Sequence, residues 1–267
     1  MEEHGCTDRG QAMNYGIQIS ASGALTSMHK QDALTGNLAN LGTAGFKPIL
    51  AGTQFRQAVR QEDGLFNLDS NDMLERLGAG VLSAPNRINF AQGALEITSS
   101  PMDVAIDGDG FFVIGFNGGQ ALTRDGRMSL NSDGTLVQSS SGRPILDPSN
   151  NPIQIDPDLG PLVIHSDGLL TQGDVEVGQL ALADVADRGI LTKHGEGLFV
   201  SKFGTPLKLI DGRGSFEQFA FEGSGVNEID ALMQIQNAAR SAQGNIGMID
   251  MQNRMMDKAI NTFGRIA

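Results

Sequence analysis

The chain has 267 residues, enough for one or two domains with a hydrophobic core, and 40% of them are apolar, as in ordinary globular proteins. Its formal charge of -12 argues against a nucleic-acid partner, because phosphate binding requires a basic face. The only cysteine, Cys6, has no second cysteine with which to form a disulfide within the chain.

The N-terminal residues lack the marks of a targeting segment. There is no stretch of about 18 apolar residues, and no basic segment is followed by an apolar one. We therefore expect neither direct membrane insertion nor an ordinary cleaved signal peptide. Residues 1–12 are polar and patternless, which predicts a flexible leader or an upstream start before Met13.

The first predicted element is a helix over residues 14–41, within an N-terminal segment 13–45. Its apolar residues recur at steps of three and four, the spacing of one helix face. Gly42 and Gly45 follow it, as glycines commonly follow helices. The residues of this stripe are Ile17, Ala21, Ala24, Leu25, Met28, Leu34, Leu38 and Leu41.

The middle of the chain has the pattern of short strands. Asp-Gly pairs recur between short apolar or alternating runs, and the clearest hairpins are predicted at 129–137 and 162–170. Further strands are predicted at 104–106, 111–114, 175–182 and 197–200. This spacing predicts an antiparallel β-sandwich or barrel over 101–222, preceded by an extended, loop-rich linker at 46–100. The fold class is α+β, mostly β.

The last segment, 223–267, is predicted to be a helix with a heptad seam, in which steps of four and three alternate. Asn253 is its one polar position; it either fixes the register of a coiled coil or faces solvent. The seam consists of Ile235, Ala239, Ala242, Ile246, Ile249, Asn253, Met256, Ile260, Phe263 and Ala267.

This C-terminal helix would not be stable alone. Burial of a seam residue contributes roughly 1–3 kcal/mol, less for alanine, whereas ordering each of about thirty residues costs about 1–2 kcal/mol. The N-terminal stripe is its natural partner. Two arrangements stay open: a helix pair within one molecule, or helices that assemble with neighbouring subunits.

Candidate catalytic groups do not converge. The four histidines lack ligand spacing, and no nucleophile elbow or phosphate-binding loop is present. Asp107 and Asp109 superficially resemble a calcium loop, but Phe111 and Gly118 stand where that loop needs oxygen ligands. We therefore expect no enzyme, no cofactor and no metal site.

Four segments, taken in chain order, resemble the flagellar rod and hook protein family. They are N-L-A-N-L-G-T-A-G-F-K at 37–47, D-V-A-I-D-G-D-G-F-F-V at 103–113, T-R-D-G-R-M-S-L at 123–130 and G-S-G-V-N at 223–227. Gly36 stands where the family usually has asparagine. Within the family, residues 78–81 and 92–95 are most similar to the distal rod subunit, then to the proximal one, and less to a hook protein.

The resemblance implies a structural subunit of the bacterial flagellar basal body, in a rod that spans the periplasm. It implies export through the flagellar type III apparatus without signal cleavage, and a helical homo-oligomer that also contacts other rod and hook subunits. The two terminal helices would pair as coiled coil in its inner wall. Asn37, Leu38, Asn40, Gly45 and Phe46 would form a hinge between helix and β domain. The alternative is a β-sandwich binding module.

Overall fold

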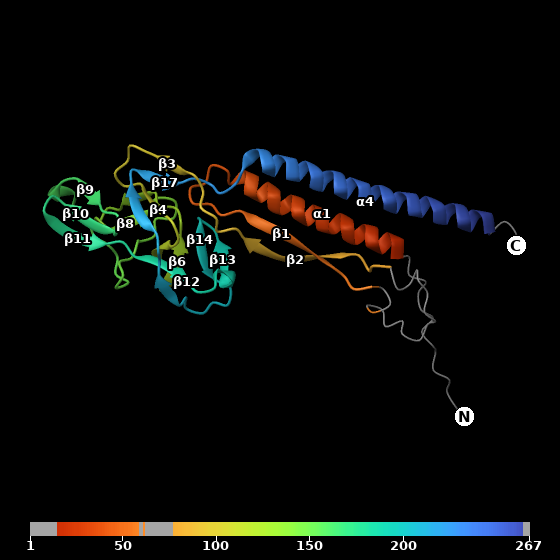
Figure 1. Cartoon of the computed structure of the whole chain (residues 1–267), viewed down its shortest axis with the longest axis horizontal. Coiled ribbons are helices and arrows are strands. Elements are labelled where there is room, and N and C mark those ends of the chain that lie inside the picture. The colour runs from red at the N-terminus through yellow and green to blue at the C-terminus, as the bar shows by residue number, and fades with distance from the viewer. Residues whose placement is uncertain (1–14, 59–60, 62–76, 264–267) are drawn as a thin grey trace, which may run out of the picture. The chain divides into compact units, whose positions relative to one another are not determined.

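The computed structural model describes residues 15–58, 61 and 77–263 (Figure 1). The expectations for the leader 1–12, for Cys6, for the side chain of Phe263 and for Ala267 lie outside this part. Two long helices, α1 (Tyr15–Ala39) and α4 (Glu228–Phe263), stand near the two ends of the described chain. The short 3-10 helices are η1 (Pro157–Leu159) and η2 (Arg188–Ile190).

Between the two long helices the chain is built of strands. The first eight are β1 (Ile49–Phe55), β2 (Val81–Ile88), β3 (Leu95–Ile97), β4 (Val104–Asp107), β5 (Phe111–Phe116), β6 (Gly119–Thr123), β7 (Met128–Leu130) and β8 (Leu136–Gln138). The others are β9 (Leu162–Ile164), β10 (Leu169–Gln172), β11 (Val175–Gln179), β12 (Leu182–Val185), β13 (Leu191–His194), β14 (Leu198–Ser201), β15 (Leu209–Asp211), β16 (Ser215–Gln218) and β17 (Ala220–Glu222). The predicted class, mostly β with a helix near each end, is confirmed.

The largest sheet has six strands in the order β13-β14-β6-β5-β12-β15, and neighbouring strands are antiparallel. Alternate residues of β5 point to opposite faces, as in any strand. Phe111 and Val113 therefore join one hydrophobic cluster, and Phe112 and Ile114 join the other. Because both faces are covered, the sequence of β5 is continuously apolar rather than alternating.

Both predicted hairpins are present. β7 pairs with β8, with Leu130 opposite Leu136, and β9 pairs with β10, with Ile164 opposite Leu170. The strands on either side of the Asp-Gly-Asp-Gly turn also form, but β4 pairs with β16 and β5 with β6 and β12. Gly108 and Gly110 have φ angles of 98° and 142°, which allow the chain to leave one sheet for another.

The strands of the described residues form separate open sheets, so the closed barrel that was one of the two predicted forms is not found. Many strands have only three or four residues, too few for one continuous ring. The other form, a sandwich, stays a prediction.

The chain divides into two compact units. The helical unit consists of the described residues among Met1–Thr35, Ala51–Asn86 and Leu232–Ala267, and so contains most of α1, α4, β1 and β2. The β-rich unit consists of Gly36–Leu50 and Arg87–Ala231 and holds both hydrophobic clusters. The five-part division predicted from the sequence stays a prediction.

Neither α1 nor α4 combines the length and the apolarity that a membrane span requires.

Candidate functional site

Within the helical unit, α1 and α4 lie side by side and run in opposite directions (Figure 1). A Cβ atom built on Gly16 would lie 2.5 Å from Nε2 of Gln252, and one on Gly23 would lie 2.9 Å from Nδ2 of Asn245. From the first contact to the second, the position advances seven residues along α1 and goes back seven residues along α4, as in an antiparallel helix pair. Glycine at 16 and 23 is what allows the polar side chains of α4 to approach so closely.

The face of α4 that lies against α1 is made of small and polar residues. Ala238, Asn245 and Gln252 are spaced by seven; Ala238 is buried, and the other two are half-buried. On α1, Ser20 and Ala24 are buried as well. Small and polar residues of α4 thus make up a large part of this pairing.

The predicted seam of α4 lies partly beside this face and partly in solvent. Its exposed members include one column spaced by seven residues, Ile246, Asn253 and Ile260, of which Ile246 is 48% and Ile260 69% exposed. Met256 is 38% exposed. The members closer to α1 are buried or half-buried: Ile235, Ala239, Ala242 and Ile249.

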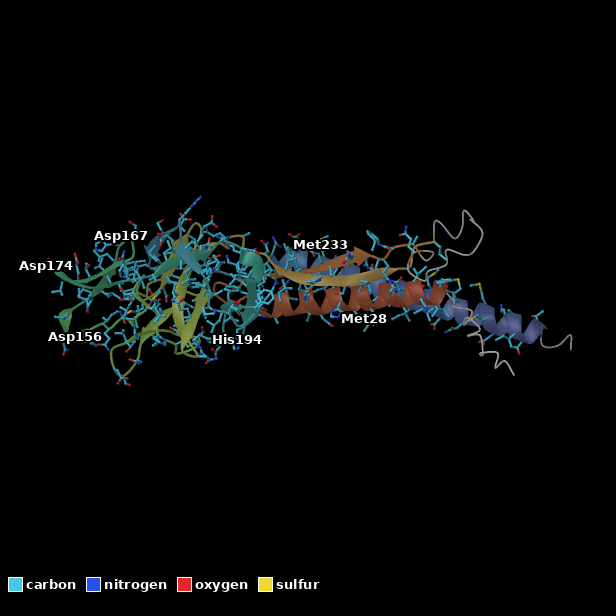
Figure 2. All side chains as sticks on the ribbon, turned by 90° about the horizontal axis from the view of Figure 1, so that it is seen from below. Met28, Asp156, Asp167, Asp174, His194 and Met233 are labelled. Carbon is cyan, nitrogen blue, oxygen red and sulfur yellow. The ribbon has the colours of Figure 1, made fainter. Side chains whose placement is uncertain are left out.

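The predicted stripe of α1 is divided in the same way. Leu25 and Met28, one turn apart, are 64% and 50% exposed. Figure 2 labels Met28 on α1 and Met233, also exposed, on α4. The remaining predicted positions are buried at Ala24 and Leu34 and half-buried at Ile17, Ala21, Leu38 and Leu41. Apolar side chains are thus left in solvent on both helices.

The predicted hinge residues are held by specific contacts within the β-rich unit. The Asn37 side chain is buried; its Nδ2 donates to Ile49 O, and its Oδ1 accepts from Ile49 N, both at 2.8 Å. Asn40 Nδ2 donates to Gly36 O at 2.8 Å. These contacts end α1 and join residue 37 to the first residue of β1.

Gly45 occupies a place that only glycine fits. Its φ is 63°, and a Cβ there would lie 2.4 Å from the carbonyl carbon of Arg124. Its N–H donates to Glu222 O at 2.6 Å. Phe46, the next residue, accepts at its carbonyl from Gly225 N at 2.9 Å. The segment after α1 is therefore joined to the segment that precedes α4.

A buried ion cluster, formed by the side chains of Lys47, Arg124 and Glu222, lies at the same place. Lys47 Nζ is 2.5 Å from Glu222 Oε1 and donates to Ala91 O at 2.8 Å; Arg124 Nη1 is 2.9 Å from Glu222 Oε2. Gly93 N donates to Glu222 Oε1 at 2.7 Å. The three side chains are at most 2% exposed. Each carboxylate oxygen therefore faces one cation.

Burial has a cost for both cations. It lowers the pKa of Lys47, an effect that the adjacent Glu222 carboxylate opposes, and it lowers the pKa of Arg124 in the same way. Arg124 is further held by Gly108 O, 2.6 Å from its Nη2, and its guanidinium lies 5.3 Å from the centroid of the Phe111 ring. One carboxylate thus partly offsets the cost of burying two cations.

A further amine, that of Lys193, lies nearby without such a carboxylate. Its Nζ is buried, has no hydrogen-bond partner among the described residues, and lies 3.5 Å from the centroid of the Phe46 ring. It lines a cavity of about 430 Å³ between residues 36–49 and 193–199. Burial lowers the pKa of Lys193 to about 8.

Among the residues that the structure describes, no three or more His, Cys, Asp or Glu side chains could together hold a metal ion. The two aspartates that resemble a calcium loop bind protein groups instead: Asp107 accepts from Gln92 Nε2 at 3.2 Å, and Asp109 from Arg188 Nη2 at 2.7 Å.

The ion cluster was not predicted from the sequence. Lys47 and Arg124 lie in segments that carry the family resemblance, but Glu222 lies in none of them. A carboxylate 175 residues from its lysine leaves no signal in local spacing. In the T-R-D-G segment, by contrast, packing explains the glycine: a Cβ on Gly126 would lie 1.6 Å from Val104 O.

Long helices with exposed apolar side chains, such as α1 and α4, are typical of proteins that assemble through helix contacts. Comparison with known proteins agrees. Residues 105–172 match the family model described as the flagellar hook protein FlgE/F/G D1 domain. The flagellar basal-body rod protein FlgF of Caulobacter vibrioides is 32% identical over 260 residues, which cover 95% of this chain and 100% of the relative.

Two further relatives are a second FlgF and a FlgG. FlgF of Mesorhizobium japonicum is 28% identical over 253 residues, covering 94% of this chain and 99% of the relative. FlgG of Buchnera aphidicola subsp. Schizaphis graminum, also a flagellar basal-body rod protein, is 31% identical over 257 residues, covering 91% and 97%.

The chain belongs to the flagellar basal-body rod protein family and is a structural subunit of the rod. These similarities do not distinguish the distal from the proximal rod subunit, so the assignment to the distal subunit stays a prediction.

Proposed function

We propose that this subunit polymerises with copies of itself and with other rod and hook subunits into the hollow drive shaft of the flagellum, and that it catalyses no reaction. The observation that carries the proposal is the row of exposed apolar side chains on α4. Large apolar residues in solvent on a long helix favour burial against another helix. A subunit of a rod has such neighbours.

The proposed assembly surface is the predicted seam of both helices. The pairing of α1 with α4 uses glycine, alanine and amide side chains together with the half-buried Ile235 and Ile249, and it leaves the exposed column Ile246, Asn253 and Ile260 to another helix. In this proposal both arrangements left open by the sequence occur together: one face of α4 pairs within the molecule, and the adjacent face pairs as coiled coil with a neighbouring subunit. On α1, Leu25 and Met28 would take the same role.

The route to the rod follows from the same proposal. The subunit would leave the cytoplasm through the flagellar export apparatus without signal cleavage and assemble where the rod spans the periplasm. The likeness to a flagellar basal-body rod protein over 95% of the chain supports assembly in the rod. The net charge of -12 also disfavours nucleic acid as a partner.

The test places charge on the exposed column. The double variant Ile246→Glu, Ile260→Glu is expected to fold as the wild type does, because both side chains reach solvent, and to abolish swimming. The control is Gln236→Glu, Gln243→Glu, which adds the same charge to exposed polar positions of α4. Circular dichroism measures folding, motility agar measures swimming, and isolated basal bodies show whether the variant is incorporated.

Normal swimming by the seam variant would contradict the proposed surface. Equal loss of swimming in both variants would also contradict it, because the effect would then come from charge on α4 in general. A seam variant that folds, swims and still binds a soluble ligand would favour the binding module instead.

A further inference from the structure

The geometry points to a clamp rather than a hinge at residues 37–49. We propose that these residues, with 89–93 and 222–225, hold together all the segments by which the chain enters and leaves the β-rich unit, and that Glu222 is the centre of this clamp. The inference concerns one subunit and does not depend on how subunits assemble.

The chain passes between its two units at four places, after residues 35, 50, 86 and 231. The first two crossings are joined because Asn37 makes two hydrogen bonds with the backbone of Ile49. The third is joined to them because Asn89 N donates to Pro48 O at 2.9 Å. The fourth is joined because Gly225 N donates to Phe46 O. Residues within the β-rich unit thus fix all four exits relative to one another.

Glu222 links these contacts to the sheets. Its carbonyl accepts from Gly45 N, and its carboxylate accepts from Lys47, Arg124 and Gly93 N. Removing a carboxylate that faces two buried cations leaves both without a counter-charge, which is far more costly than losing an exposed pair. The ion cluster is therefore expected to determine how stable the hydrogen bonds of the clamp are.

A hinge requires backbone that can change its φ and ψ angles. Gly45 cannot do so freely, because its positive φ and the backbone of Arg124 leave no space around it. Gly36, by contrast, lies in α1 at the first crossing, and a Cβ there would meet nothing within 4 Å. Bending is therefore expected outside the clamp, beginning at Gly36.

The experiment is amide hydrogen exchange, followed by NMR, on the full chain. Glu222→Gln is expected to speed exchange at Gly45, Ile49 and Gly225 by about tenfold or more, while amides in the centre of β5 and β6 change by less than about threefold. The matched control is Glu217→Gln, which removes one carboxylate from the exposed side of β16. It is expected to leave the three clamp amides unchanged.

A purely structural role would speed exchange in the clamp and in β5 and β6 alike, and that result would overturn the proposal, as would unchanged exchange in the clamp. If Glu222→Gln does not fold, Asn37→Ala serves, because it removes the bonds to Ile49 without leaving a buried charge. It is then expected to speed exchange at Gly225, which Asn37 does not contact, and unchanged exchange there would refute the clamp.

Discussion

The amine of Lys193 is buried with no carboxylate bound to it, whereas that of Lys47 forms an ion pair with Glu222. Its Nζ rests on the ring of Phe46, and burial lowers its pKa from the ordinary 10.5 to about 8. Between these two values the unfolded chain holds a proton that the folded chain has released. Stability therefore rises with pH across this window, and below it the buried charge lowers stability in full.

Lys193→Met is expected to raise the free energy of unfolding at neutral pH by about 1 kcal/mol, a value well below the full effect of the pKa because the side chain is only partly shielded from water. The gain should shrink as the pH approaches 10.5. Urea unfolding at several pH values measures it, with the exposed Lys208→Met as the control. A gain that does not depend on pH, or an equal gain from Lys208→Met, would contradict this account.

At the scale of the element, α4 illustrates what apolar periodicity can and cannot predict. The two helices and both hairpins were predictable, because their patterns are local. Two residues of α4 that face α1 were not: Asn245 and Gln252 are polar, and they fit only because Gly23 and Gly16 lie opposite them. Likewise, no local pattern could have paired Glu222 with Lys47 and Arg124.

The glycines of the helices provide a test of this packing. Gly244→Ala is expected to stabilise the chain by up to about 1 kcal/mol, because a Cβ there meets nothing within 4 Å and alanine favours helix. Gly23→Ala gains the same propensity, but its Cβ would lie 2.9 Å from Asn245. We expect it to be less stable than Gly244→Ala by at least about 1 kcal/mol in thermal unfolding. Equal gains would show that α1 and α4 are not packed as described.

At the scale of the whole molecule, the two units have different sources of stability. The β-rich unit contains both hydrophobic clusters and the ion cluster, so its described core is independent of α4. The helical unit has many small and polar residues between its helices and leaves several large apolar ones in solvent. A rod subunit built in this way would keep a stable β-rich unit before assembly and gain order in its helices afterwards.

Deleting residues 232–267, the part of α4 outside the β-rich unit, tests this difference, since the clamp contact of Gly225 is retained. The β-rich unit is expected to remain folded and resistant to protease, because its two hydrophobic clusters contain no residue of α4. Cells that carry only the shortened chain are expected not to swim. Limited proteolysis and a motility assay measure the two outcomes, with the full-length chain expressed from the same promoter as the control. Swimming with the shortened chain would refute the role given to α4.

The position of Glu222 in the chain has a consequence for the order of folding. It follows Lys47 by 175 residues and Arg124 by 98 residues. A growing chain therefore contains Lys47 and Arg124 long before it contains the acid that pairs with them. The ion cluster is therefore expected to form late in folding, when the last strand, β17, pairs with β3 and brings Glu222 to both cations.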